Sequence, residues 1–200
     1  MSCVNRLRVG FASLAAALLL GACATGGTGG GSSPSSARAS SPEAQLHNQA
    51  VAAVQAGDPA TAEALFLQLT QEHPRYATPW LNLALLLHKR GAHADSATVL
   101  AEAIKRDSGL APAWNLQGVL AREANDVDAA EAAYRQALNA DGSYAPAWLN
   151  LGILLEIWRG QLDGALRAYQ KYQELSPAES VDPRVAGWIA DLQRRLDRGA

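Results

Sequence analysis

The sequence is poor in cysteine, poor in aromatic residues and has no excess of positive charge. Two cysteines among 200 residues argue against a disulfide framework or a thiolate zinc site. Lys and Arg total 17 against 19 Asp and Glu, a formal net charge of -2. Since nucleic-acid binding relies on a basic surface that displaces counterions, we expect no nucleic-acid partner. Hydrophobic residues make up 48% of the chain, which excludes disorder of the whole.

Long apolar runs are also scarce. An apolar run over residues 9–20 has 12 residues and would span about 18 Å as a helix, short of the ~30 Å hydrocarbon core of a bilayer. Arg6 and Arg8 precede the run, and its length fits the apolar part of a signal peptide, roughly 7–15 residues. The run is followed by Leu20-Gly21-Ala22-Cys23.

That four-residue ending resembles the lipobox of bacterial lipoproteins. The resemblance implies a signal peptide over residues 1–22, cleavage after Ala22 and lipid attachment to Cys23. Ala24 is not the Asp that retains many such lipoproteins in the inner membrane, so the family pattern favours an outer-membrane anchor facing the periplasm. The alternative is an ordinary secretory signal in which Cys23 is incidental.

A tether is predicted next, over residues 23–42, beginning with the lipidated cysteine. After Cys23 it reads ATGGTGGGSSPSSARASSP, with no apolar period and many glycines and serines. Such a segment has no core to bury, so we expect it to be flexible.

The rest of the chain repeats itself. Trp80, Trp114 and Trp148 are separated by 34 residues each, and Ala-Pro-Ala precedes both Trp114 and Trp148. Small residues recur at fixed positions of the period, as do large ones. The small set is Ala50, Ala84, Gly118 and Gly152, and the large set includes Phe66, Leu100, Tyr134 and Tyr169. A fixed period of this length indicates a repeat architecture.

The period and its landmarks resemble the tetratricopeptide repeat (TPR), a helix–turn–helix unit. The resemblance implies an all-α, right-handed TPR solenoid of about four repeats, with a TPR domain over residues 43–179. The expected repeats are 43–76, 77–110, 111–144 and 145–179, and a capping helix with the C-terminus is expected at 180–200. The cap has one apolar stripe, made of Val185, Trp188, Ile189, Leu192 and Leu196.

The fourth repeat is one residue longer than the others. Counted from Trp148, its turn glycine, Gly160, arrives one residue late. The extra residue falls near Trp158 and could lengthen the turn or form a π-bulge in the preceding helix. We expect Trp158 to pack on that turn, with an exposed contact residue as the alternative.

No pattern of a catalytic or metal site is recognisable. The four histidines, His47, His73, His88 and His93, include no i, i+4 pair with the Glu of a zinc protease helix. Neither a Gly-x-Ser-x-Gly elbow nor a Gly-Lys-Ser/Thr phosphate loop occurs. We therefore predict no catalytic residues, no metal, no cofactor, no small-molecule substrate and no enzymatic activity.

The TPR resemblance implies that the first helix of each repeat lines a concave groove. The predicted groove residues are Leu81, Asn82, Leu85, Lys89, Asn115, Val119, Arg122, Leu149, Asn150 and Ile153, and the same reasoning adds His47, His88 and Glu156. Apolar residues with a few amides and cations suit an extended peptide or a helix. The sequence thus predicts a membrane-tethered, non-enzymatic scaffold for protein partners. Alternatives are a pilotin-like assembly factor for a type IV pilus or secretion system and a docking factor for peptidoglycan enzymes.

Overall fold

The computed structural model describes residues 41–177 and 181–199, and within them it contains nine helices and no strand. The helices are α3 (Pro42–Gln55), α4 (Pro59–Glu72), α5 (Ala77–Lys89), α6 (His93–Arg106), α7 (Ala111–Glu123), α8 (Val127–Ala140), α9 (Ala145–Ile157), α10 (Leu162–Leu175) and α11 (Pro183–Gly199). In this part of the chain, no helix is both long enough and apolar enough to cross a bilayer.

Several sequence predictions fall outside the described residues. They are the signal peptide over residues 1–22, lipid attachment at Cys23, the tether up to residue 40, and the boundary between residues 179 and 180. Of the predicted tether, Ser41 and Pro42 are described. Pro42 is already helical, and Ser41 is the N-cap of α3, its Oγ accepting a hydrogen bond from the backbone N–H of Ala44 at 3.4 Å.

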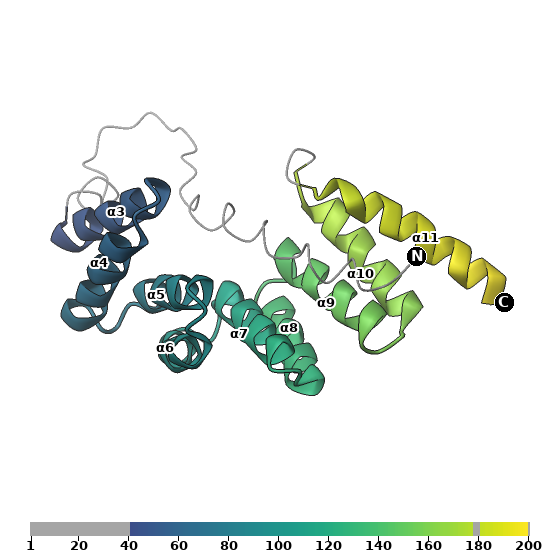
Figure 1. Cartoon of the computed structure of the whole chain (residues 1–200), viewed down its shortest axis with the longest axis horizontal. Helices are drawn as coiled ribbons and strands as arrows, with labels where there is room; N and C mark the ends of the chain where they lie inside the picture. The colour runs from purple at the N-terminus through teal and green to yellow at the C-terminus, as the bar shows by residue number, and fades with distance from the viewer. Residues whose placement is uncertain (1–40, 178–180, 200) are drawn as a thin grey trace, which may run out of the picture.

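The helices form antiparallel pairs that stack in chain order, as Figure 1 shows. The pairs are α3–α4, α5–α6, α7–α8 and α9–α10; their first members are called A helices below and their second members B helices. Each B helix packs on the A helix of the next pair, and α10 packs on α11. The described chain is therefore an all-α solenoid of four helical pairs followed by a ninth, unpaired helix, α11, as the repeat period predicts.

The repeated tryptophans form hydrogen bonds to the loops that connect successive helical pairs. The indole Nε1–H of Trp80 donates to the carbonyl oxygen of Pro74 at 3.1 Å, that of Trp114 to Ser108 at 2.8 Å, and that of Trp148 to Gly142 at 2.9 Å. In each case the acceptor lies six residues earlier, in the loop before the A helix. One side chain thus anchors the entry of every repeat from the second to the fourth.

The extra residue of the fourth repeat lies in the turn between its two helices. All 13 residues of α9 are described and α-helical, so the helix matches α5 and α7 in length and holds no π-bulge. Four residues separate Ile157 from Leu162, whereas three separate the corresponding helices of the two preceding pairs. Trp158 caps α9 and is half-buried, with the guanidinium carbon of Arg122 5.8 Å from its ring centroid.

The last helix, α11, covers the end of the solenoid with the predicted apolar stripe. Val185, Ile189 and Leu192 are buried, and the ring centroid of Trp188 lies 5.4 Å from that of Tyr169. The opposite face of α11 is not entirely exposed to solvent, because Arg195 on that helix hydrogen-bonds to Glu156 of α9.

Glu156 of α9 is paired with Arg195 and is buried, so its side chain is not accessible from the predicted groove. Its side chain is 5% exposed; Oε1 accepts from Nη1 of Arg195 at 3.0 Å and Oε2 accepts from the hydroxyl of Tyr169 at 3.0 Å. The expectation that Glu156 lines a partner groove is therefore wrong, since the cap covers it.

Two glycines let the paired helices approach closely. A Cβ on Gly118 of α7 would lie 2.4 Å from Cε1 of Tyr134, and one on Gly152 of α9 would lie 2.6 Å from Cε1 of Tyr169. Both tyrosines are buried, so their rings have no free space into which to retreat. The small residues at this repeat position are required by the aromatic ring on the facing helix.

We expect Gly118→Ala to lower the stability of the solenoid. Alanine favours a helix interior by about 1 kcal/mol over glycine, but overpacking a filled core costs about 1–3 kcal/mol. Gly187→Ala in α11 is the matched control, because nothing lies within 4 Å of its added Cβ. Thermal unfolding followed by circular dichroism should show a lower Tm for Gly118→Ala and a higher one for Gly187→Ala. Equal increases would contradict the steric explanation.

Candidate functional site

Polar pairs join successive A helices on the side that the sequence predicts to be concave. Nδ2 of Asn150 donates to Oδ1 of Asn115 at 2.9 Å, and Nδ2 of Asn82 lies 3.4 Å from Nε2 of His47. Burial lowers the pKa of His47, which favours the neutral ring whose Nε2 can accept this bond. Each pair links residues 35 positions apart, so the same register recurs along the solenoid.

The predicted groove residues differ in accessibility. Leu81, Asn115, Val119 and Asn150 are 4%, 1%, 3% and 5% exposed, so the solenoid itself covers them. The accessible remainder comprises the exposed Lys89 and the half-buried Asn82, Leu85, Arg122, Leu149 and Ile153. Four of the ten predicted groove residues are thus buried within the solenoid, and the other six are accessible.

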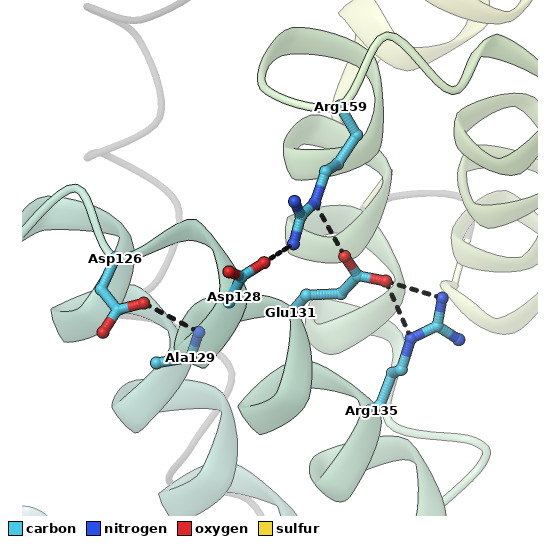
Figure 2. A network of polar contacts seen from close by, with 6 residues as sticks. All are labelled: Asp126, Asp128, Ala129, Glu131, Arg135 and Arg159. Atoms are coloured by element: carbon cyan, nitrogen blue, oxygen red, sulfur yellow. Dashed lines mark hydrogen bonds and ion pairs between the residues drawn. The ribbon is translucent and has the colours of Figure 1, made fainter.

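The junctions between a B helix and the next A helix are of two kinds. At the first junction, α4–α5, Nη1 of Arg90 contacts both carboxylate oxygens of Glu63, at 3.0 and 2.8 Å. At the third, α8–α9, Nε of Arg159 donates to Oε2 of Glu131 at 3.0 Å, and its Nη2 bonds Asp128 (Figure 2). Glu63 and Glu131 occupy the same repeat position, so an arginine from the A–B turn bridges back to the B helix at both outer junctions.

The acidic cluster at the start of α8 thus has two roles. Asp126 is the N-cap of α8, its Oδ1 accepting from the backbone N–H of Ala129 at 3.0 Å. Glu131 accepts from Arg159 and also from Arg135 on its own helix, at 2.9 Å from Nη2 (Figure 2). A favourable interaction of carboxylates with the N-terminal end of the helix dipole accounts for the first role only. The second role depends on Arg159, in the turn that carries the extra residue.

The middle junction, α6–α7, has no such bridge among its described residues. Ala97 stands where the outer junctions have Glu63 and Glu131, and Ala124 stands where the first has Arg90. Ala121 likewise replaces a leucine that is buried in the neighbouring repeats, 6% exposed at Leu87 and 4% at Leu155. Small side chains therefore leave space at this junction that larger ones fill elsewhere.

That space is a mainly apolar cleft of about 520 Å³. It is lined from α6 by Ala97, Leu100, Ala101, Ile104 and Lys105, and from α7 by Trp114, Gln117, Leu120 and Ala121. Sequence reasoning missed this cleft. The available signal was the coincidence of alanines at positions 97, 101, 121 and 124, which becomes visible only when the repeats are compared residue by residue.

Two histidines and a glutamate lie close together where the second and third helical pairs meet. His88 is near the end of α5, His93 begins α6, and Glu123 ends α7. Nε2 of His88 lies 3.0 Å from Oε2 of Glu123, and Nδ1 of His93 lies 3.3 Å from the same oxygen. Their side chains are 15%, 54% and 19% exposed for His88, His93 and Glu123. Sequence reasoning noted both histidines but missed Glu123, which the 35-residue register between A helices brings to His88.

This geometry defines the chain as a helical-repeat solenoid with an open middle junction. Comparison with protein families identifies the repeat: residues 47–111 and 115–180 match the tetratricopeptide repeat family. The chain belongs to this family, whose members are in general protein-interaction modules without enzymatic activity. A search of curated protein sequences gives no significant match.

Solved structures share the architecture at low sequence identity. PilF of Pseudomonas aeruginosa is 19% identical, with a TM-score of 0.68 over 78% of this chain and 69% of that one. A thermophilic TPR protein of Thermus thermophilus, TTC0263, is 23% identical, with a TM-score of 0.62 over 80% and 86%. MamA of Desulfovibrio magneticus RS-1 is 18% identical, with a TM-score of 0.62 over 78% and 87%. Identities at this level establish the fold alone.

We expect the Asn115–Asn150 pair to be structural and strongly coupled. Asn150→Leu removes the donor and leaves the buried oxygen of Asn115 unpaired, which should lower the free energy of unfolding by about 1–3 kcal/mol. The double variant Asn115→Leu/Asn150→Leu should lose less than the sum of the single losses, because no orphaned polar group remains. Urea unfolding of the four proteins measures the coupling. Additive losses would show that the bond contributes nothing.

Proposed function

We propose that this chain is a membrane-tethered scaffold that binds a protein partner at its middle junction, without catalysing a reaction. The cleft between α6 and α7 carries the proposal, because alanines stand at the positions whose larger counterparts fill the outer junctions. Membership of a family of protein-interaction modules supports it. An apolar groove is a common docking surface for a helix or an extended peptide of a partner protein.

The cleft suits a helical or extended segment with an apolar face. Its lining on α6 runs from Ala97 to Lys105, which is just over two helical turns or roughly 12 Å. A partner helix would present apolar side chains to such a groove at i, i+3 and i+4 spacing. The exposed Lys105 in the lining favours an acidic residue beside that apolar face.

The membrane anchor is part of the same proposal. The basic residues at positions 6 and 8, the short apolar run and the lipobox-like ending support lipid attachment at Cys23, with the solenoid on the periplasmic side of the outer membrane. Two acyl chains suffice for stable anchoring, since each buried methylene contributes about 0.8 kcal/mol. Anchoring would hold the solenoid at the surface where its partner is encountered.

We expect Cys23→Ala to abolish lipid attachment, because it removes the thiol that would be acylated. Radiolabelled palmitate should enter the parent protein and not the variant, and the variant should keep its first 22 residues. Cys3→Ala is the control and should label normally, since Cys3 would leave with the signal peptide. Normal labelling of Cys23→Ala would contradict the anchor and leave the solenoid's binding role untouched.

Filling the middle junction should abolish partner capture without unfolding the protein. Ala97→Glu, Ala121→Leu and Ala124→Arg together copy residues that the outer junctions carry at these positions, so the melting temperature should be unchanged or raised. Crosslinking in the native envelope, with mass spectrometry, compares this variant with the parent. The parent should crosslink one protein that the filled variant loses.

A second variant separates the cleft from the predicted concave groove. Lys89→Glu reverses the exposed cation of that set and lies outside the cleft lining. If Lys89→Glu loses the partner and the filled variant keeps it, the binding site lies on the concave face and not in the cleft. The other accessible residues of that face are Asn82, Leu85, Arg122, Leu149 and Ile153. Capture kept in both would contradict binding at either surface.

A pilotin-like role in assembling a pilus or secretion apparatus is the second candidate. The observation that favours it is the likeness of the solenoid to PilF, which concerns the fold. The identity of the crosslinked protein distinguishes the two alternative roles. A secretin or pilus component would support the pilotin-like role, and a peptidoglycan enzyme would support docking of cell-wall enzymes.

A further inference from the structure

The His88, His93 and Glu123 side chains form a set of three potential metal ligands. Each offers one ligand atom, and these atoms all lie within 4.8 Å of one another. The three residues come from the end of α5, the start of α6 and the end of α7, and hence from two successive repeats. We propose that they bind a divalent transition-metal ion, zinc being the best match, at the middle junction of the solenoid.

The distances are close to those that a zinc ion requires. Bonds of about 2.0–2.1 Å in tetrahedral geometry place ligand atoms roughly 3.3 Å apart. Glu123 already lies 3.0 Å from His88 and 3.3 Å from His93. The ring of His93 must move toward that of His88, and it is free to do so because it is half exposed at the first residue of α6.

The ligand types also match. Two imidazoles and one carboxylate form a common zinc set that leaves a fourth position for water or another ligand. Glu123 contacts His88 through both of its carboxylate oxygens, at 3.1 and 3.0 Å from Nε2. The second imidazole lies close by as well, with its ring centroid 5.3 Å from that of His88 and its Nδ1 3.3 Å from Oε2 of the same carboxylate.

The position of the set gives the ion a structural consequence. The outer junctions are bridged by Arg90–Glu63 and Arg159–Glu131, whereas the middle junction has alanines in place of both partners. An ion held by His88, His93 and Glu123 would join the two repeats at the junction where this bridge is absent from the described residues. The proposal concerns an ion on this chain alone and does not depend on partner binding.

The test uses the full chain without a histidine tag, with Cys3 and Cys23 replaced by serine so that thiolates do not contribute. Zinc chloride is titrated calorimetrically, and cobalt(II) is added separately to record the visible absorption of a tetrahedral site. His88→Gln and His93→Gln remove one ligand each. His73→Gln is the matched control, because His73 lies outside the set.

We expect one zinc ion per chain with a Kd in the micromolar range or below, a raised melting temperature and cobalt bands between about 500 and 650 nm. His88→Gln and His93→Gln should each weaken binding at least tenfold and remove the cobalt bands, whereas His73→Gln should match the parent. Glutamine at position 88 can still donate to Glu123, so the variant should fold. Absence of stoichiometric binding below 1 mM, or binding that survives both substitutions, would overturn the proposal and leave a histidine–carboxylate contact only.

Discussion

The hydrogen bond from each repeated tryptophan to a loop carbonyl six residues earlier sets the spacing of the whole solenoid. It fixes where an A helix begins relative to the preceding B helix, at Trp80, Trp114 and Trp148 alike. Every longer-range feature inherits this register, because the same step places residue i of one A helix beside residue i+35 of the next. The amide pairs and the contact of His88 with Glu123 are consequences of it.

The fold was predictable because its signal is periodic and redundant. Trp114, Gly118 and Tyr134 mark one repeat, and their counterparts 34 residues away mark the next. The place of the extra residue in the fourth repeat was not predictable, because a longer turn and a π-bulge require the same number of residues. Only the helical pattern up to Ile157 distinguishes them.

The candidate site was predictable only in part. Repeat position tells which side of an A helix a residue occupies, but not how closely the neighbouring A helix covers that side. Position alone therefore predicts Asn115 and Asn150 as partner contacts, although they bind each other. The middle junction was missed because its signal is a difference between repeats. Ala97 and Ala121 are ordinary when seen alone, and they become informative beside Glu63, Leu87 and their later counterparts.

The bond between Arg195 and Glu156 also decides how long an array this chain can build. Another copy stacked on α10 would have to displace α11, and would then leave a carboxylate buried without its cation. The loss is smaller than for a fully buried ion pair, because the side chain of Arg195 is 42% exposed and its charge is partly screened by solvent. The solenoid is thus closed at its C-terminal end by charge as well as by shape, which disfavours growth into fibres through that end.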